Sequence, residues 1–258
     1  MKRLCIVRRG HMGDVILTEP VVSALVKGYD RVVLYTEFLN IGHYLAIYDE
    51  VLPFSLYEGS AVKETDTVIS PLYEIYPGCN HLDGFARSCG VSLERRLPNL
   101  RSGSLPVWER PYILIAPDTS FWIREMRQWP RARFAELARL MQRFLTPDVV
   151  FLEPSHSFAE MMALIEHCEV FVGNDSGPAM IAQCYSRPTF VLFGATLPSL
   201  VLLSPLATAL VSDVGCNGCK HFARHTDITC ATPLCLESLC VKEVIAVILE
   251  RISPEYLR

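Results

Sequence analysis

Residues 170–196 carry the residue types and spacing expected of a phosphate-binding turn. An apolar run ends at Val172, and the polar turn 174–178 follows before an apolar helical pattern and a second apolar run. A strand that enters a helix through such a turn exposes backbone N–H groups at the positive end of the helix dipole, where they can bind an anion. The pattern therefore predicts a site for a nucleotide or a nucleotide sugar.

A second candidate is Asp14, which lies in a glycine-containing polar loop between the first predicted strand and the first predicted helix. Ligand-contacting residues of α/β sheets lie in such loops, at the carboxyl ends of the strands. Gly10 and Gly13 allow the backbone to approach a ligand closely. Asp14 is then either a ligand-facing carboxylate or a helix N-cap, and the spacing alone does not decide between them. The loop lacks the GxGxxG spacing of a dinucleotide site.

Four cysteines near the end of the sequence could bind one zinc or iron ion tetrahedrally, because they lie in one short segment. The set is Cys216, Cys219, Cys230 and Cys235, and either His221 or His225 within the same segment could replace a thiol. A reduced loop that packs without metal is the alternative. In both cases we expect a structural and not a catalytic role.

The elements that must position these residues alternate between strand and helix. In the first part of the chain, apolar patterns predict strands at 4–7, 31–35, 51–54 and 67–70, and helices at 15–26 and 81–89. Residues 95–110 are rich in Pro, Arg, Ser and Gly, which is typical of a linker. The alternation then restarts, with strands predicted at 112–116, 149–152, 170–172, 189–193 and 209–211, and helices at 132–144, 158–168, 179–185 and 241–252.

Two such runs separated by a linker predict an α/β protein with two Rossmann-like domains that face each other across a cleft. We expect an N-terminal domain at 1–108, a C-terminal domain at 109–240 and a C-terminal helix at 241–258, which could pack on either domain. The first domain would hold Asp14, and the second would hold the phosphate-binding turn.

The bulk composition is that of a soluble globular protein: half of the 258 residues are hydrophobic, a fifth are charged, and the formal net charge is −4. This charge gives no general attraction to nucleic acid. No apolar run approaches the roughly 20 residues that span a bilayer, and the apolar run at the N-terminus is too short for a signal peptide. We therefore expect a cytoplasmic protein whose cysteines are reduced or bound to metal, and not paired as disulfides.

Three motifs resemble those of glycosyltransferase family 9, the bacterial heptosyltransferases. The segment 11–20 resembles the N-terminal motif of the family, 127–130 resembles its central basic-x-Trp-Pro element, and 170–196 resembles its donor-site signature. The three occur in the family's order and span most of the chain. The resemblance implies a GT-B architecture with the active site between two Rossmann-like domains. It also implies transfer of heptose or a related sugar from a nucleotide-diphosphate donor, ADP-heptose above all, without a catalytic metal.

Under this resemblance, Asp14 would be the general base that removes a proton from the acceptor hydroxyl while its oxygen attacks the anomeric carbon and inverts it. The departing nucleotide diphosphate would be stabilised by backbone N–H groups near Ser176 and Gly177 and by the Ser176 hydroxyl. Arg127, which stands where the family usually has lysine, would supply a cation.

Four further residues would complete the donor site by the same resemblance. Gly13 lies in the N-terminal motif, and Thr119 and Ser120 lie where the family has small hydroxyl residues against the phosphates. Asp175 matches the acidic residue that recurs most regularly in the donor signature of the family. It would stabilise the turn or contact the sugar. Asp118 is unexpected, because a second carboxylate would repel the donor unless it turns away as a cap.

The acceptor that the resemblance implies is a lipopolysaccharide-type or other glycan, free or lipid-linked. A lipid-linked acceptor would bring the protein to the inner membrane as a peripheral protein without a transmembrane segment. Two other functions stay open. One is a non-catalytic or degenerate sugar-nucleotide-binding or assembly protein, and the other is a metal-stabilised protein O-glycosyltransferase. No cofactor is expected for catalysis, and structural zinc or iron is expected only at the thiols.

Overall fold

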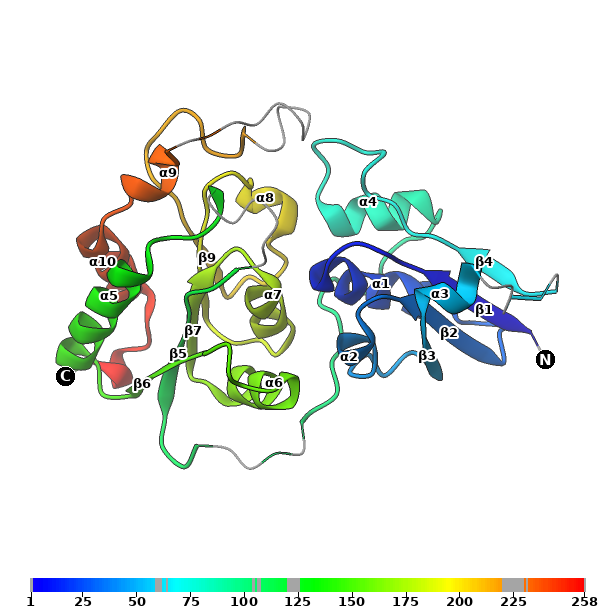
Figure 1. Ribbon diagram of the computed structural model, residues 1–258, viewed down its shortest axis with the longest axis horizontal. Coiled ribbons are helices and arrows are strands. Elements are labelled where there is room, and N and C mark those ends of the chain that lie inside the picture. The colour runs from blue at the N-terminus through cyan, green and yellow to red at the C-terminus, as the bar shows by residue number, and fades with distance from the viewer. Residues whose placement is uncertain are drawn as a thin grey trace. The chain divides into compact units, whose positions relative to one another are not determined.

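The computed structural model divides into two units, Met1–Ser102 and Gly103–Arg258 (Figure 1). It describes residues 2–58, 62–63, 65–103, 105, 108–119, 126–219, 230 and 232–257. Each unit contains one parallel sheet with helices around it, as in Rossmann-like domains. No helix within these ranges is long and apolar enough to cross a membrane.

The first unit is built on a four-stranded sheet. Its strands are β1 (Arg3–Val7), β2 (Arg31–Thr36), β3 (Glu50–Pro53) and β4 (Thr67–Ile69), and its helices are α1 (Met12–Leu25), α2 (Leu39–Gly42), α3 (Phe54–Glu58) and α4 (His81–Ser88). The strand order is β3-β2-β1-β4, and neighbouring strands are parallel. β1 and β2 are almost completely buried because both faces of their apolar runs are covered.

The first sheet has a switch point between β1 and β4. The chain passes outward from β1 to β2 and β3, and β4 then adds on the other side of β1. Ligands of open α/β sheets bind outside the carboxyl ends of the strands at such a point. The segments that follow these two strands, 8–14 and 71–74, therefore meet where a ligand is expected.

The second unit is built on a five-stranded sheet in the order β6-β5-β7-β8-β9, again with parallel neighbours. Its strands are β5 (Tyr112–Ala116), β6 (Asp148–Phe151), β7 (Val170–Asn174), β8 (Thr189–Leu192) and β9 (Ala207–Leu210). Its helices are α5 (Arg131–Phe144), α6 (Phe158–His167), α7 (Gly177–Cys184), α8 (Pro198–Val201), α9 (Leu234–Glu237) and α10 (Val241–Arg251), with a final turn η3 (Pro254–Tyr256). The switch point lies between β5 and β7, which are followed by segments 117–119 and 174–178.

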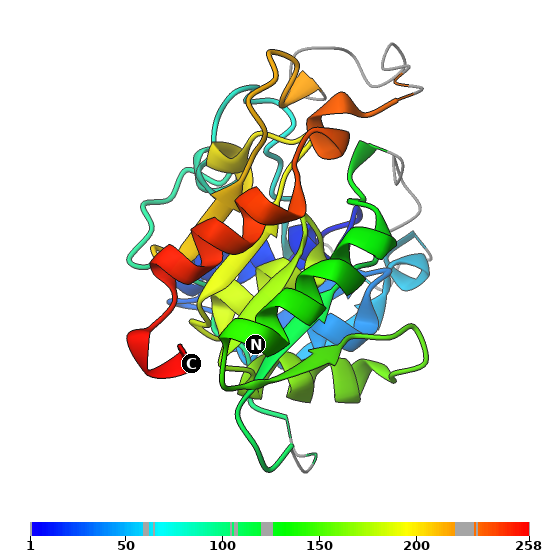
Figure 2. The same cartoon turned by 90° about the vertical axis from the view of Figure 1, so that its left-hand side faces the viewer.

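The main core of the second unit lies between its sheet and the helices α5 and α10. These two helices lie side by side on one face (green and red in Figure 2), while α6 and α7 cover the other face (Figure 1). Trp129 is fully buried in this core, edge-on to Phe134 with 5.0 Å between the ring centroids. Its indole Nε1 donates a hydrogen bond to Leu239 O (2.9 Å). The C-terminal helix α10 is thus packed into the second unit.

The segment predicted as a linker, 95–110, begins with residues that are held in the first unit. The buried carboxylate of Glu19 accepts a hydrogen bond from Asn99 N (3.1 Å). Arg101 N donates to a backbone carbonyl of the same unit (2.8 Å). The division between the units falls directly afterwards, at Ser102.

Helix α1 begins three residues earlier than its apolar periodicity predicts, at Met12 and not at Val15. The backbone of His11 is extended, and its N–H donates to the side chain of Asp14. This contact satisfies one of the N–H groups that a helix start leaves unpaired. Gly13 and Asp14 therefore belong to the helix and not to the preceding loop.

Candidate functional site

Asp14 occupies the third position of α1, which corrects its interpretation as an N-cap. Oδ2 of Asp14 accepts a hydrogen bond from the N–H of His11, the N-cap residue, at 2.7 Å. Oδ1 faces a guanidinium nitrogen of Arg8 at 3.5 Å. Only 8% of Asp14 is exposed. One carboxylate oxygen is thus bound to the backbone, while the other lies beside a cation.

The two glycines of this segment have different roles. Gly10 has a φ of +108°, and a Cβ at this position would collide with Oδ2 of Asp14. Only glycine therefore allows the carboxylate to reach back to His11. Gly13 is helical, and a Cβ there would meet no described atom within 4 Å. The space beside Gly13 is compatible with the close approach of a ligand.

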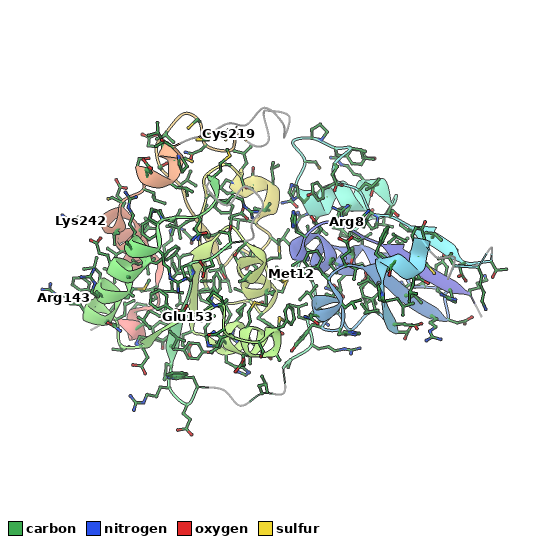
Figure 3. The ribbon with its side chains drawn as sticks, in the orientation of Figure 1. Arg8, Met12, Arg143, Glu153, Cys219 and Lys242 are labelled. Atoms are coloured by element: carbon green, nitrogen blue, oxygen red, sulfur yellow. The ribbon has the colours of Figure 1, made fainter. Side chains whose placement is uncertain are left out.

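Arg8, the first residue after β1, is buried beside Asp14; Figure 3 labels Arg8 and Met12, on either side of the loop that joins β1 to α1. Its Nη1 and Nη2 atoms contact the Glu74 carboxylate at 3.4 and 2.6 Å. Nη1 also donates to Pro71 O at 3.1 Å. The first switch point therefore contains a buried arginine between two carboxylates.

These charges shift the pKa of two groups at the first switch point. Burial lowers the pKa of Arg8, but the hydrogen bond to Glu74 and the charges of Asp14 and Glu74 outweigh burial, and the pKa is raised overall. Burial, followed by the negative charges of Asp14 and Glu74, raises the pKa of Tyr73. Arg8 therefore stays charged and Tyr73 stays neutral across the physiological pH range.

Asn174, the last residue of β7, connects three segments at the carboxyl edge of the second sheet. It is fully buried, its Oδ1 accepts a hydrogen bond from Trp129 N (2.9 Å), and its Nδ2 donates to Pro117 O (2.7 Å). A buried amide that is bonded at both ends rigidifies its surroundings. Residues 126–130, the turn 174–178 and the loop after β5 are therefore held at the same edge.

Arg127 and Asp175 form an ion pair at this edge. Nη2 of Arg127 lies 3.1 Å from Oδ2 of Asp175 and donates to the backbone oxygen of Asp175 at 2.5 Å. The side chains are only 12% and 13% exposed. Arg127 is thus a held cation beside the start of α7, and pairing reduces the repulsion that Asp175 would exert on an anionic ligand.

Several buried polar atoms near this edge have no hydrogen-bond partner among the residues that the structure describes. They include Nε of Arg127, Oγ of Ser176 and Oγ1 of Thr196. Ser176 is the N-cap of α7, and Thr196 follows β8. Because buried polar atoms are usually paired, these atoms favour a polar ligand here.

The other predicted donor-site residues also follow β5 or β7. Gly177 is the first residue of α7, and Thr119 is buried in the segment after β5. Ser120 lies outside the described residues. Asp118 pairs with Arg131, the first residue of α5, at 2.8 Å, so a side chain balances its charge.

The cysteine-rich segment follows β9 and extends into α9, which contains Cys235; Figure 3 labels Cys219 within the segment. Burial and the neighbouring thiols of Cys216, Cys219 and Cys230 raise the pKa of Cys235 to about 11. Within the described parts of the chain, no group of three or more His, Cys, Asp or Glu side chains is arranged to hold a metal ion. The two histidines predicted as alternative ligands lie outside those parts. The other three thiols act electrostatically on Cys235, but among the described residues the four are not arranged as a coordination site.

Sequence reasoning missed Arg8, Glu74 and Thr196, and it placed Asn174 in the polar turn without predicting its contacts to Trp129 and Pro117. Arg8 directly follows β1 and Asn174 ends β7, so an inspection of polar residues at the end of each predicted strand would have found these two. The contact between Arg8 and Glu74 has no local signal, since the two are 66 positions apart.

Comparison with known proteins relates part of the chain to one family. The model of glycosyltransferase family 9 (heptosyltransferase) matches residues 142–227. Over 51 residues, the chain is 47% identical to lipopolysaccharide heptosyltransferase 3 of Escherichia coli. This stretch covers 20% of this chain and 15% of that protein. Over 52 residues, it is 33% identical to lipopolysaccharide heptosyltransferase 1 of Campylobacter coli, with the same 20% and 15% coverage. The matched segment thus spans only 15% of the length of these curated relatives.

Solved structures extend the likeness to the whole fold. The iron-containing dodecameric glycosyltransferase TibC from enterotoxigenic E. coli matches with a TM-score of 0.73 and 17% identity, over 96% of this chain and 76% of that one. E. coli ADP-heptose LPS heptosyltransferase II matches with a TM-score of 0.67 and 16% identity, over 97% of this chain and 98% of that one. At these identities the likeness establishes the fold. The prediction of an α/β, GT-B architecture with two Rossmann-like domains is confirmed, as is the resemblance to family 9.

Proposed function

We propose that this relative of glycosyltransferase family 9 is an inverting glycosyltransferase that moves heptose or a related sugar from a nucleotide-diphosphate donor to a hydroxyl of a glycan acceptor. ADP-heptose is the first donor to test, and a lipopolysaccharide-type glycan is the first acceptor. One observation carries the proposal. The loop and helix start that contain Asp14 and the turn 174–178 are far apart in sequence, and each lies at the switch point of a Rossmann-like sheet.

In this proposal the second unit binds the donor diphosphate. The N–H groups in the first turn of α7, from Gly177 onward, bind phosphate oxygens, except that Pro178 has none to offer. The hydroxyl groups of Ser176 and Thr119 and the guanidinium of Arg127 add hydrogen bonds. Nε of Arg127 and Oγ of Ser176, which have no hydrogen-bond partner within the described residues, support this assignment. Arg127 then stabilises the charge that develops on the leaving nucleotide diphosphate.

The first unit supplies the base. Asp14 takes the proton of the acceptor hydroxyl while the hydroxyl oxygen forms a bond to the anomeric carbon. The bond between that carbon and the diphosphate oxygen breaks, and its electron pair leaves with the nucleotide diphosphate. The space beside Gly13 allows a substrate to approach the carboxylate.

A donor screen tests the proposal. The purified chain is mixed with ADP-heptose, GDP-sugars and UDP-sugars, and its melting temperature and the release of nucleotide are measured. A donor at a hundred times its Kd stabilises the folded state by about 2.7 kcal/mol, which gives a measurable rise in melting temperature. We expect this rise with ADP-heptose, together with ADP release that increases when the glycan acceptor is added.

Other outcomes of the screen assign different functions. If a donor binds but neither a glycan nor a Ser/Thr-containing polypeptide promotes its turnover, the protein is a non-catalytic sugar-nucleotide binder. If only the polypeptide promotes turnover, the chain is a protein O-glycosyltransferase. If none of the donors binds, the glycosyltransferase proposal fails.

The thiol cluster forms a second, structural part of the proposal: Cys216, Cys219, Cys230 and Cys235 together hold one zinc or iron ion. Thiolates suit both metals. The first three thiols lie near enough to Cys235 to raise its pKa. A metal would displace the thiol protons and gather the four sulfur atoms around one point. One of the structural relatives is described as iron-containing.

Metal analysis of anaerobically purified protein tests this part. We expect about one zinc or iron ion per chain, since four thiolates complete one tetrahedral site. Cys235→Ser should lose the metal and melt at a lower temperature. Cys240→Ser is the matched control, because Cys240 is exposed and lies outside the set. Wild-type protein without metal, or equal metal content in the two variants, would contradict the assignment.

A further inference from the structure

Arg8 is fixed by the sheet to which it belongs. Its backbone N–H donates to Tyr35 O (3.0 Å) and so continues the pairing of β1 with β2 by one residue. Only 5% of the residue is exposed. The side chain of Arg8 therefore projects from a backbone position that is held by the sheet of the first unit.

The segment between β4 and α4 holds the guanidinium from the other side of the switch point. Glu74 binds it through both carboxylate oxygens, and Pro71 O accepts a further hydrogen bond. The guanidinium carbon lies 5.3 Å from the ring centroid of Tyr73 and 4.8 Å from that of Phe85. Planar, multidentate contacts of this kind leave an arginine little freedom.

Arg8 touches the carboxylate of Asp14 without forming a short, two-pronged pair with it. The distance from Nη2 to Oδ1 is 3.5 Å, compared with 2.6 Å from the same nitrogen to Glu74. Oδ2 of Asp14 is bound to His11 N. The two oxygens of Asp14 thus have separate partners in His11 N and Arg8. The side chain of Tyr73 also hydrogen-bonds this carboxylate. Together these contacts set the direction in which the carboxylate points.

We propose that Arg8, held by Glu74, is a positioning residue that orients the carboxylate of Asp14 for proton transfer from the acceptor. Glu74 accepts the short hydrogen bond from Nη2 of Arg8 (2.6 Å), so Arg8 orients Asp14 without binding both of its oxygens. Glu74 also balances the positive charge of Arg8. This inference rests on the proposed function, in which Asp14 is the base.

Steady-state kinetics of four variants test the inference. We expect Arg8→Met to lower kcat by about 10- to 100-fold while the donor KM changes by less than about twofold, because a misplaced catalytic group slows the chemical step. Arg8→Lys should have a higher kcat than Arg8→Met, since an ammonium keeps the positive charge but lacks the planar, two-pronged geometry of a guanidinium. Glu74→Gln should lower kcat by a smaller factor. Arg9→Met is the control, because Arg9 is the neighbouring arginine, is 60% exposed and pairs with Glu37.

The split between kcat and KM separates positioning from a merely structural role. A normal kcat in Arg8→Met, or a raised donor KM with an unchanged kcat, would overturn the inference. If Arg8→Met does not fold, as judged by circular dichroism, Arg8→Lys and Glu74→Gln decide the question. A lower kcat with normal donor KM in either supports positioning, and normal kcat in both overturns it.

The same experiments distinguish this inference from the proposed function. If the wild-type chain transfers no sugar, the proposed function fails and the inference with it. If the wild type is active and Asp14→Asn is equally active, Asp14 is not the base, and there is nothing for Arg8 to position. If Asp14→Asn is inactive while the Arg8 and Glu74 variants have a normal kcat, only the inference fails.

Discussion

Asp14→Asn should reduce sugar transfer by about 10²- to 10⁴-fold, the usual contribution of a general base. Asparagine has the shape of aspartate, and its amide oxygen can still accept the hydrogen bond from His11 N. It cannot accept the acceptor proton, so kcat falls, whereas the donor is held by other residues and should bind as before. The measurements are kcat with ADP-heptose and a glycan acceptor, and the donor Kd by calorimetry.

The chain contains a closely matched control for this variant in Asp83→Asn. Asp83 occupies the third position of α4, as Asp14 does in α1, and also contacts an arginine, Arg96. It is partly exposed and lies outside the switch point. We expect wild-type kcat from this control. Transfer by Asp14→Asn at the wild-type rate would remove Asp14 from its proposed role.

Arg127→Met should weaken donor binding by about 10- to 100-fold, because a hydrogen bond to a charged group contributes about 1.5–3 kcal/mol. The substitution also leaves the carboxylate of Asp175 without its cation. An unbalanced negative charge beside the diphosphate adds repulsion to the lost attraction. The donor Kd, measured by calorimetry with ADP and with ADP-heptose, checks this result.

Two further variants separate these effects. Arg139→Met removes an exposed arginine of α5 and should leave the donor Kd unchanged. Combining Arg127→Met with Asp175→Asn removes the repulsion and should recover part of the affinity, provided that Asp175 mainly holds Arg127. If the double variant binds the donor more weakly than Arg127→Met, Asp175 contacts the sugar directly. A normal Kd in Arg127→Met would contradict the proposed role of Arg127.

Much of the fold could be predicted because its signals are local. The apolar runs of β1, β5 and β7 are short and bounded by polar residues, and Ser176 and Pro178 mark the start of α7 within a few positions of one another. The start of α1 was misplaced for a reason that is also physical. Met12 and Gly13 carry no apolar periodicity, and the cap depends on how the side chain of Asp14 folds back.

Site contacts between distant segments could not be predicted in the same way. Arg8 precedes a loop of polar residues, and its partner Glu74 belongs to a segment without a recognisable motif. Likewise, nothing near Asn174 indicates that it joins Trp129 to Pro117. These contacts follow from strand order, which places β4 beside β1 and β5 beside β7.

The sequence by itself determined which residues have the chemistry of a phosphate-binding turn, from Asn174 to Pro178, and which acid stands at the start of the first helix. Such features depend on residue type and short spacing. Only the tertiary structure decided what surrounds them: Arg127 paired with Asp175 beside the turn, and Asp14 held between His11 N and Arg8. The physical reason is that charge, burial and hydrogen bonding at a switch point come from strands that are neighbours in the sheet but not in the chain.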